Sequence, residues 1–300
     1  MKKQTKGWLF AAGVLVLGGL LLFAAVMTAY GWDFRKLSTL AYEINSHDIN
    51  ETFRSISIRA DTADVTLLPT GDGKCRVVCV EEERAKHTVA VRDGKLLVEL
   101  TEEKKWFHQI GINIGEPSIT VYLPRDSYDA LSIGVDTGDV VIPGDYHFES
   151  MEISGSTGDV KNGASVSGAM KITTSTGDIS VKNLSAAALS LAVSTGDIEV
   201  EAVRCDTFRS SGDTGKISME NVLVAGRLSV ERSTGDVAFE RCDAAEIFVQ
   251  TDTGDVEGSL LSEKQFLAES ATGKVRVPQA GAGGICEIHS STGEIQLEIA

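Results

Sequence analysis

Cysteine is among the residues that this sequence has little of, with five in 300 residues. The five are Cys75, Cys79, Cys205, Cys242 and Cys286, an odd number without a CxxC pair. Cys75 and Cys79 share one face of a predicted strand, but roughly 13 Å along that strand separates them, which is too far for a direct disulfide bond. Cys242 and Cys286 fall at predicted core positions and are expected to be small buried side chains. The sequence therefore supports neither a disulfide framework nor a cluster of metal ligands.

Well-known catalytic motifs are also absent. The sequence has no Gly-x-Ser-x-Gly motif, no phosphate-binding loop and no HExxH motif. Its histidines lie in unrelated contexts, at His47, His87, His108, His147 and His289. We therefore expect a protein that is not an enzyme and that needs no cofactor.

Positive charge is scarce beyond residue 32. All 43 acidic residues follow that position, together with 25 of the 28 basic residues, so this part of the chain has a net charge of −18. Such a negative net charge opposes binding to nucleic acid and to anionic lipid headgroups. It favours solubility, cations or a basic partner. A solvated surface without a partner would have the same composition and is the simpler interpretation.

One long stretch has no charged residue. It runs for 23 residues from Trp8 to Tyr30, and three lysines precede it within residues 1–6. This length suffices to cross a hydrocarbon core of roughly 30 Å, and aromatic residues favour the two interfaces. A cleavable signal peptide is the alternative. Its apolar region would be shorter, about 7–15 residues, and Met27-Thr28-Ala29 is a poor cleavage site.

The predicted topology follows from this stretch. Residues 1–7 are expected in the cytoplasm because they are basic, although Arg35 and Lys36 weaken the charge asymmetry. Residues 8–30 form the transmembrane helix, and residues 33–300 lie outside the cell. We therefore expect an uncleaved, single-pass protein of the cell membrane.

From residue 137 onward a three-residue motif recurs at a fixed interval of 19 or 20 positions. A fixed period of this length is typical of a solenoid in which each repeat forms one coil. The nine copies are Thr137-Gly138-Asp139, Thr157-Gly158-Asp159, Thr176-Gly177-Asp178, Thr195-Gly196-Asp197, Thr214-Gly215-Lys216, Thr234-Gly235-Asp236, Thr253-Gly254-Asp255, Thr272-Gly273-Lys274 and Thr292-Gly293-Glu294.

Apolar residues recur at fixed distances from each of these threonines. An aliphatic residue stands three positions after the Thr in every copy, and apolar residues dominate four and six positions before it and five positions after it. Residues two apart point to the same side of a strand, so each coil should hold two short half-buried strands that meet at the turn. Stacked coils turn these positions into continuous apolar ladders. We predict an all-β parallel β-solenoid (β-helix) of about ten coils, with regular repeats over residues 131–300.

Residues 53–130 are expected to hold a degenerate first coil around Thr62-Ala63-Asp64 and the strands that cap the solenoid. Strand patterns occur at residues 75–81, 88–91, 96–100 and 119–123, and Asp93-Gly94 predicts a hairpin. These strands should pair in antiparallel fashion and cover the N-terminal end of the stack. The preceding residues 31–52 are expected to be a polar connector.

The conserved spacing gives each turn residue a physical role within the coil. A glycine after every Thr suggests a positive φ, which a Cβ would penalise. The structural turn glycines are Gly138, Gly158, Gly177, Gly196, Gly215, Gly235, Gly254, Gly273 and Gly293. The following aspartates can accept hydrogen bonds from turn amides. Stacked carboxylates can also bind calcium, which makes calcium candidates of Asp139, Asp159, Asp178, Asp197, Asp236 and Asp255.

Two further features suggest interaction surfaces. Trp106 and Phe107 lie in a loop between predicted strands that looks exposed, so they either pack on the cap or face a ligand or membrane. The last coil stops at Ala300 without a polar capping segment. An uncapped rung would offer unpaired backbone groups to a second copy or another partner.

The repeated Ser/Asp-Thr-Gly-Asp-Ile/Val phrase, with Ile119-Thr-Val-Tyr-Leu-Pro followed by Leu131-Ser-Ile, resembles the bacterial putative adhesin or Toastrack family of β-strand repeats. The resemblance covers roughly residues 50–300. It implies an extracytoplasmic domain behind a membrane anchor, a role in the cell envelope and an association with envelope-stress systems. It implies no catalytic residues.

We therefore expect a membrane-anchored extracytoplasmic solenoid that acts as a non-catalytic interaction, scaffold or adhesin-like module. Its expected partners are the membrane and an envelope protein, a cell-wall polymer or a second copy bound through the C-terminal coil. Nucleic acid is not among them. The alternatives are a β-helix carbohydrate-active enzyme that acts on cell-wall or extracellular polysaccharide, and a calcium-dependent assembly module.

Overall fold

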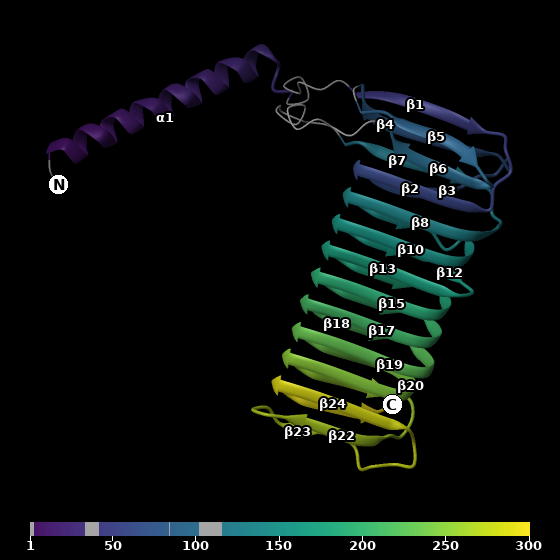
Figure 1. Ribbon diagram of the computed structural model, residues 1–300. Helices are drawn as coiled ribbons and strands as arrows, with labels where there is room; N and C mark the ends of the chain where they lie inside the picture. Colours follow the sequence, from purple (N-terminus) through teal and green to yellow (C-terminus); the bar gives the residue numbers. More distant parts are fainter. Residues whose placement is uncertain (1–2, 34–41, 84, 102–115) are drawn as a thin grey trace.

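The computed structural model describes residues 3–33, 42–83, 85–101 and 116–300, which form one helix and a long stack of strands (Figure 1). Helix α1 spans Lys3–Ala29. Its segment Ala12–Ala29 has a mean hydropathy of 2.3, and only 6% of that segment is buried. The helix is therefore long and apolar enough to cross a membrane, although a signal sequence would meet the same criteria.

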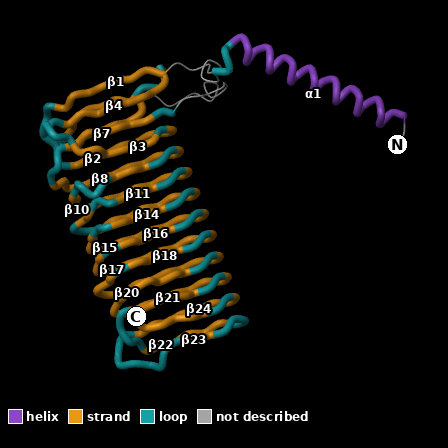
Figure 2. Tube along the Cα trace, turned by 180° about the vertical axis from the view of Figure 1, so that it is seen from behind, coloured by secondary structure: helices purple, strands orange, loops and turns teal. Residues whose placement is uncertain are grey.

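The strands pair into two long sheets that form facing walls of the stack, and β20 (Val237–Thr253) contributes to both (Figures 1 and 2). In spatial order, sheet A contains β1 (Tyr42–Ile49), β4 (Cys75–Glu82), β7 (Ser118–Leu123), β3 (Asp64–Pro69), β9 (Val140–Ile142), β11 (Val160–Asn162), β14 (Ile179–Lys182), β16 (Ile198–Glu201), β18 (Ile217–Glu220), β20, β21 (Val256–Leu260), β25 (Ile295–Ile299) and β23 (Val275–Arg276). Sheet B contains β5 (His87–Arg92), β6 (Lys95–Leu100), β2 (Ser55–Thr62), β8 (Ser127–Thr137), β10 (His147–Thr157), then β12 (Ser165–Val166) and β13 (Ala169–Thr176) in one rung on β10, and then β15 (Ser185–Thr195), β17 (Arg204–Thr214), β19 (Leu223–Thr234), β20, β24 (Ile285–Thr292) and β22 (Gln265–Ser270).

The core of the stack lies between the two sheets and is built from the predicted ladders. In the coil around Thr176, for example, Ile172, Ile179 and Val181 are at most 1% exposed. Equivalent residues pair in register from coil to coil, as Ile153 does with Ile172. Each coil thus covers the apolar face of its neighbour, and the chain is a parallel β-solenoid as predicted.

The solenoid has about eight regular turns, slightly fewer than the ten or so expected. In these turns the glycine after the Thr has a positive φ. The two remaining turns of the stack lack this geometry. One contains Ala63, which cannot adopt it without strain, and the other contains Gly273, whose φ lies outside the positive region.

At the C-terminal end the spatial order of the coils differs from the sequence order. Strand β24 lies between β20 and β22, and β25 lies between β21 and β23. The outermost rung is therefore formed by β22 and β23, not by the last coil. The prediction that the last coil is an uncapped end, open to self-association, is wrong because that coil is paired on both sides.

Burial explains why these two coils exchange places. The last coil supplies Cys286, Ile288, Ile295 and Leu297, all at most 5% exposed. In the coil of β22 and β23, one core position holds the small side chain of Ala268. At another core position, Val275 is 40% exposed. The coil with the weaker apolar face thus lies at the solvent, and the stronger one is covered on both sides.

A similar exchange occurs at the N-terminal end. Strand β2 lies between β8 and β6, and β3 lies between β9 and β7, so β6 and β7 form a further parallel rung. The predicted capping strands then follow in antiparallel pairing: β5 on β6, β4 on β7 and β1 on β4. Strand β1 lies within residues 31–52, so part of the expected connector belongs to this cap.

Candidate functional site

The aspartates of the turns form a ladder of hydrogen bonds along one edge of the solenoid. The backbone N–H of Asp159 donates to Asp139 Oδ1 at 2.8 Å. The N–H of Asp178 donates to Asp159 Oδ1 at 2.9 Å, and the N–H of Asp197 donates to Asp178 Oδ1 at 2.7 Å. Each carboxylate thus satisfies an amide of the neighbouring turn, which gives a structural reason for an acidic residue at this position.

Two lysines take the place of the aspartate in the turn motif, and they lie at different points of the ladder. Lys216 donates its backbone N–H to Asp197 Oδ1 at 2.9 Å but has no carboxylate to offer Asp236, so the ladder is interrupted there. Lys274 lies in the outermost rung, where no further turn needs an acceptor. Within the described residues the ladder resumes with Asp236, Asp255 and Glu294.

The calcium hypothesis for Asp139, Asp159, Asp178, Asp197, Asp236 and Asp255 stays a prediction. In the ladder, Oδ1 of each of these aspartates except Asp255 accepts from the turn that follows in sequence, and Asp255 accepts from Glu294, two turns later in the sequence. Asp236 accepts from Asp255 at 2.8 Å. A calcium ion would have to bind the second carboxylate oxygen or displace these bonds. The predicted interaction loop with Trp106 and Phe107 lies outside the described residues.

The turn glycines lie in close contact with the neighbouring turn. Gly196 has a φ of +147°, and a Cβ built there would lie 2.1 Å from the carbonyl oxygen of Gly177. The other regular turns repeat this geometry. A side chain at these positions would both strain the backbone and separate the rungs.

A groove of about 880 Å³ lies on the outer face of sheet A, on the wall that carries β16, β18 and β21 in Figure 2. Successive rungs each contribute acidic side chains because the residues four and six positions after the turn Thr point outward. Phe239 and Leu297 lie beneath the groove, because their side chains are at most 5% exposed and belong to the core. The glutamates that line the groove are Glu199, Glu201, Glu220, Glu240, Glu257 and Glu298.

Part of this negative charge is neutralised by ion pairs. Lys182 Nζ lies 2.7 Å from Glu199 and 3.1 Å from Glu201, and Arg241 lies 3.4 Å from Glu220. The hydrogen bond from Lys182 lowers the pKa of the Glu199 carboxyl below its usual value. These three glutamates are therefore held by basic neighbours at one end of the groove.

The other end of the groove is more acidic. Glu240, Glu257 and Glu298 are exposed and form no ion pair with any residue that the structure describes. Among the described residues that line the groove, Arg276 is the only basic one, and it donates to Gln296 at 3.3 Å. The arrangement concentrates negative charge at this end of the groove.

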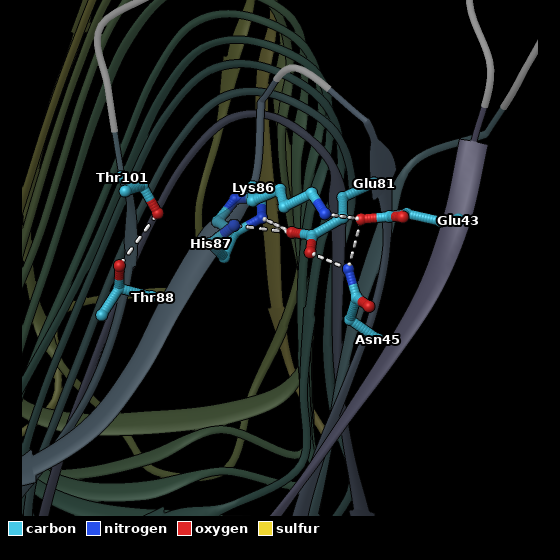
Figure 3. Close-up of polar contacts among 7 residues, drawn as sticks. All are labelled: Glu43, Asn45, Glu81, Lys86, His87, Thr88 and Thr101. Carbon is cyan, nitrogen blue, oxygen red and sulfur yellow. Dashed lines mark hydrogen bonds and ion pairs between the residues drawn. The ribbon is translucent and has the colours of Figure 1, made fainter.

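A second cluster of polar residues lies inside the N-terminal cap (Figure 3). Glu81 of β4 accepts hydrogen bonds from the backbone N–H of His87 at 2.6 Å and from Asn45 Nδ2 at 2.7 Å, and its Oε2 lies 2.8 Å from His87 Nδ1. Asn45 also donates to Glu43 at 2.8 Å, and Glu43 pairs with Lys86. Glu81 is 2% exposed and His87 8% exposed, so the pair is buried.

Sequence reasoning missed this cluster because its members appear scattered. Cys79 joins it, since its Sγ lies within 4.8 Å of the nearest ligand atoms of Glu81 and His87. Burial, and to a smaller extent the Glu81 charge, raises the pKa of the Cys79 thiol to about 12. The available signal was a glutamate two positions after a core cysteine on a predicted strand, which places a charge on the inward face.

Comparison with known proteins identifies the repeats. The sequence model of the family Toastrack DUF4097 matches residues 53–298. A putative adhesin from Parabacteroides merdae is similar in structure, with 12% identity and a TM-score of 0.54, over 86% of this chain and 96% of that one. A putative lipid binding protein from Parabacteroides distasonis has 14% identity and a TM-score of 0.53, over 87% of this chain and 98% of that one. No curated protein matches the sequence.

Proposed function

The chain belongs to the Toastrack DUF4097 family, and from this premise we propose that it is a membrane-anchored, non-catalytic binding module of the cell envelope. Helix α1 is the anchor, and residues 33–300 lie outside the cytoplasm. The names of the similar structures, a putative adhesin and a putative lipid binding protein, support binding rather than catalysis.

The partner is a cationic segment of an envelope protein, and the acidic groove on sheet A is the observation that carries this proposal. Six glutamates line the groove, and three of them form no ion pair with a described residue. The five rungs that carry these glutamates, from β16 to β25, cover roughly 19 Å at the usual strand spacing. An extended segment of about six residues spans that distance.

The overall charge favours this class of partner. A net charge of −18 beyond residue 32 repels anionic polymers and anionic headgroups and speeds encounter with basic proteins. The neighbouring groove of about 710 Å³ contains Lys161, Lys182 and Lys216 beside three of the ladder aspartates, so its charge is more balanced. Recognition is therefore assigned to the more acidic groove.

Binding of a hexalysine peptide to the full chain in detergent tests the proposal. The triple variant E240Q/E257Q/E298Q removes the unpaired charges of the groove. We expect its affinity to fall about tenfold at low salt, since each exposed charge contributes roughly 0.5 kcal/mol, and wild-type binding should weaken as salt screens the groove.

A matched control removes the same amount of charge from the opposite wall. Glu149, Glu246 and Glu269 are exposed, lie on strands of sheet B and form no ion pair within the described ranges. E149Q/E246Q/E269Q should bind hexalysine within twofold of the wild type. Equal losses in both variants would mean that only net charge matters, and the groove would not be the site.

A further inference from the structure

Three side chains with different metal-ligand chemistry meet inside the N-terminal cap. Cys79 and Glu81 point inward from β4 of sheet A, and His87 begins β5 of sheet B. Their exposures are 0%, 2% and 8%, and the thiol, carboxylate and imidazole ligand atoms all lie within 4.8 Å of one another. The cluster thus joins the two walls of the solenoid where the cap closes them.

Hydrogen bonding satisfies only part of this cluster. Glu81 accepts from three donors, two of His87 and one of Asn45. His87 Nε2, in contrast, is buried and has no hydrogen-bond partner in the described part of the chain. An unpaired buried imidazole nitrogen is costly in a structural pair, so a simple buried Glu–His contact leaves it unexplained.

The cluster also borders a small pocket. Glu81 and His87 line a cavity of about 10 Å³, which is about the room that one water molecule or one ion needs. The carboxylate and the imidazole therefore face a space that is too small for an organic ligand.

We propose that Cys79, Glu81 and His87 bind one divalent metal ion of the zinc class. Thiolate and imidazole are ligands that zinc prefers and that calcium and magnesium avoid. In a tetrahedral site the sulfur and nitrogen ligands lie roughly 3.5 Å apart, so side-chain shifts of about 1 Å bring the three groups into place. Cys79 binds as thiolate and releases its proton to solvent.

The surrounding residues fit an outer shell for such a site. Asn45 Nδ2 donates to Glu81 at 2.7 Å and to Glu43 at 2.8 Å, so it fixes the carboxylate from β1. Hydrogen bonds of this kind orient metal ligands and strengthen binding. Three protein ligands leave a fourth position for water in the cavity. The ion would tie β4 to β5 and so link sheet A to sheet B at the cap.

Cobalt binding to the full, untagged chain in detergent tests this proposal. One equivalent of Co²⁺ added to chelator-treated protein should give a thiolate-to-cobalt absorption band in the near ultraviolet, and one equivalent of Zn²⁺ should abolish it. Metal analysis after gel filtration should return one zinc per chain. Absence of the band in the wild-type protein would overturn the proposal without any variant.

Matched variants assign the band to this cluster. C79S should lose the band, and C75S should keep it, because Cys75 is a buried cysteine of the same strand that lies outside the cluster. H87Q should weaken zinc binding at least tenfold. H289Q should leave it unchanged, since His289 pairs with Glu287 at 2.9 Å far from the cap. A band that survives C79S, or is lost equally in C75S, would place the metal elsewhere.

Discussion

At the scale of single residues, the turn motif divides its work between glycine and aspartate. Glycine lets each turn lie directly against the carbonyl oxygen of the turn before it, and aspartate caps an amide of the turn after it. Neither residue contributes to the apolar core. The motif therefore recurs because every rung must meet its neighbours through the same backbone contacts.

Replacing Gly196 with alanine should destabilise the protein by about 3 kcal/mol. The new Cβ would lie 2.1 Å from the carbonyl oxygen of Gly177, at a φ of +147°. G134A is the matched control, because a Cβ there meets only Ser154 Oγ at 3.6 Å. Urea unfolding followed by circular dichroism measures both. Equal stability of G196A and G134A would mean that the turns are not packed as described.

Replacing Asp178 with alanine should cost about 1 kcal/mol, because the amide of Asp197 loses an acceptor at 2.7 Å and must turn to water. D178N keeps an acceptor oxygen and removes one like charge from the column, so it should stay within about 0.5 kcal/mol of the wild type. Comparing both unfolding curves with calcium and with a chelator also tests the calcium hypothesis. Stabilisation of the wild type by calcium that is lost in D178N would favour a metal role.

At the scale of the elements, the order of the coils is the feature that sets this chain apart from a simple spiral. The last coil lies inside the stack and the preceding coil forms its end. At the other end, β2 and β3 are likewise covered by strands that come later in the sequence. Both exchanges give a strongly apolar coil neighbours on each side.

Cysteine cross-linking can test this order. Gln250 is the partner of His289 on the outer face, and His289 is in turn the partner of Glu269. Q250C/H289C should therefore cross-link efficiently with a short thiol-reactive linker, whereas Q250C/E269C should not, since a whole strand separates them. The five native cysteines are buried and should react little. The reverse result would restore the sequential order.

The sequence contains enough information for each coil but not for their order. The spacing around each Thr defines which residues face the core and where the chain turns, because those depend on local geometry. The turn around Thr292 can follow the turn around Thr253 equally well, since Gly254 donates to the Thr292 carbonyl at 2.9 Å as Gly235 donates to Thr253 at 2.8 Å. Order is decided by relative burial across coils, which a periodic pattern does not encode.

The candidate sites also differ in how far the sequence predicts them. The outward positions that build the acidic groove share the coil period, so their side of the solenoid was predictable. The cap cluster was not, because Cys79 and His87 meet only through the pairing of β4 with β7 and of β5 with β6 across two walls. Long-range antiparallel pairing of this kind leaves no fixed spacing in the sequence.

At the scale of the whole molecule, the chain combines an apolar helix with a rigid stack that displays one acidic groove. Rigidity follows from the continuous pairing of the two sheets, in which every regular coil is bonded on both sides. A groove on such a support is preorganised, so a flexible basic segment bears most of the ordering cost on binding. This arrangement suits recognition more than chemistry.

Carboxyl footprinting of the full chain in lipid nanodiscs is the measurement that tests this account most directly. Glycine ethyl ester labelling, read by mass spectrometry, would report each glutamate with and without hexalysine. We predict that the peptide protects Glu240, Glu257 and Glu298 several-fold and leaves Glu149, Glu246 and Glu269 unchanged. Equal protection on both walls, or protection confined to sheet B, would contradict the assignment of binding to the groove.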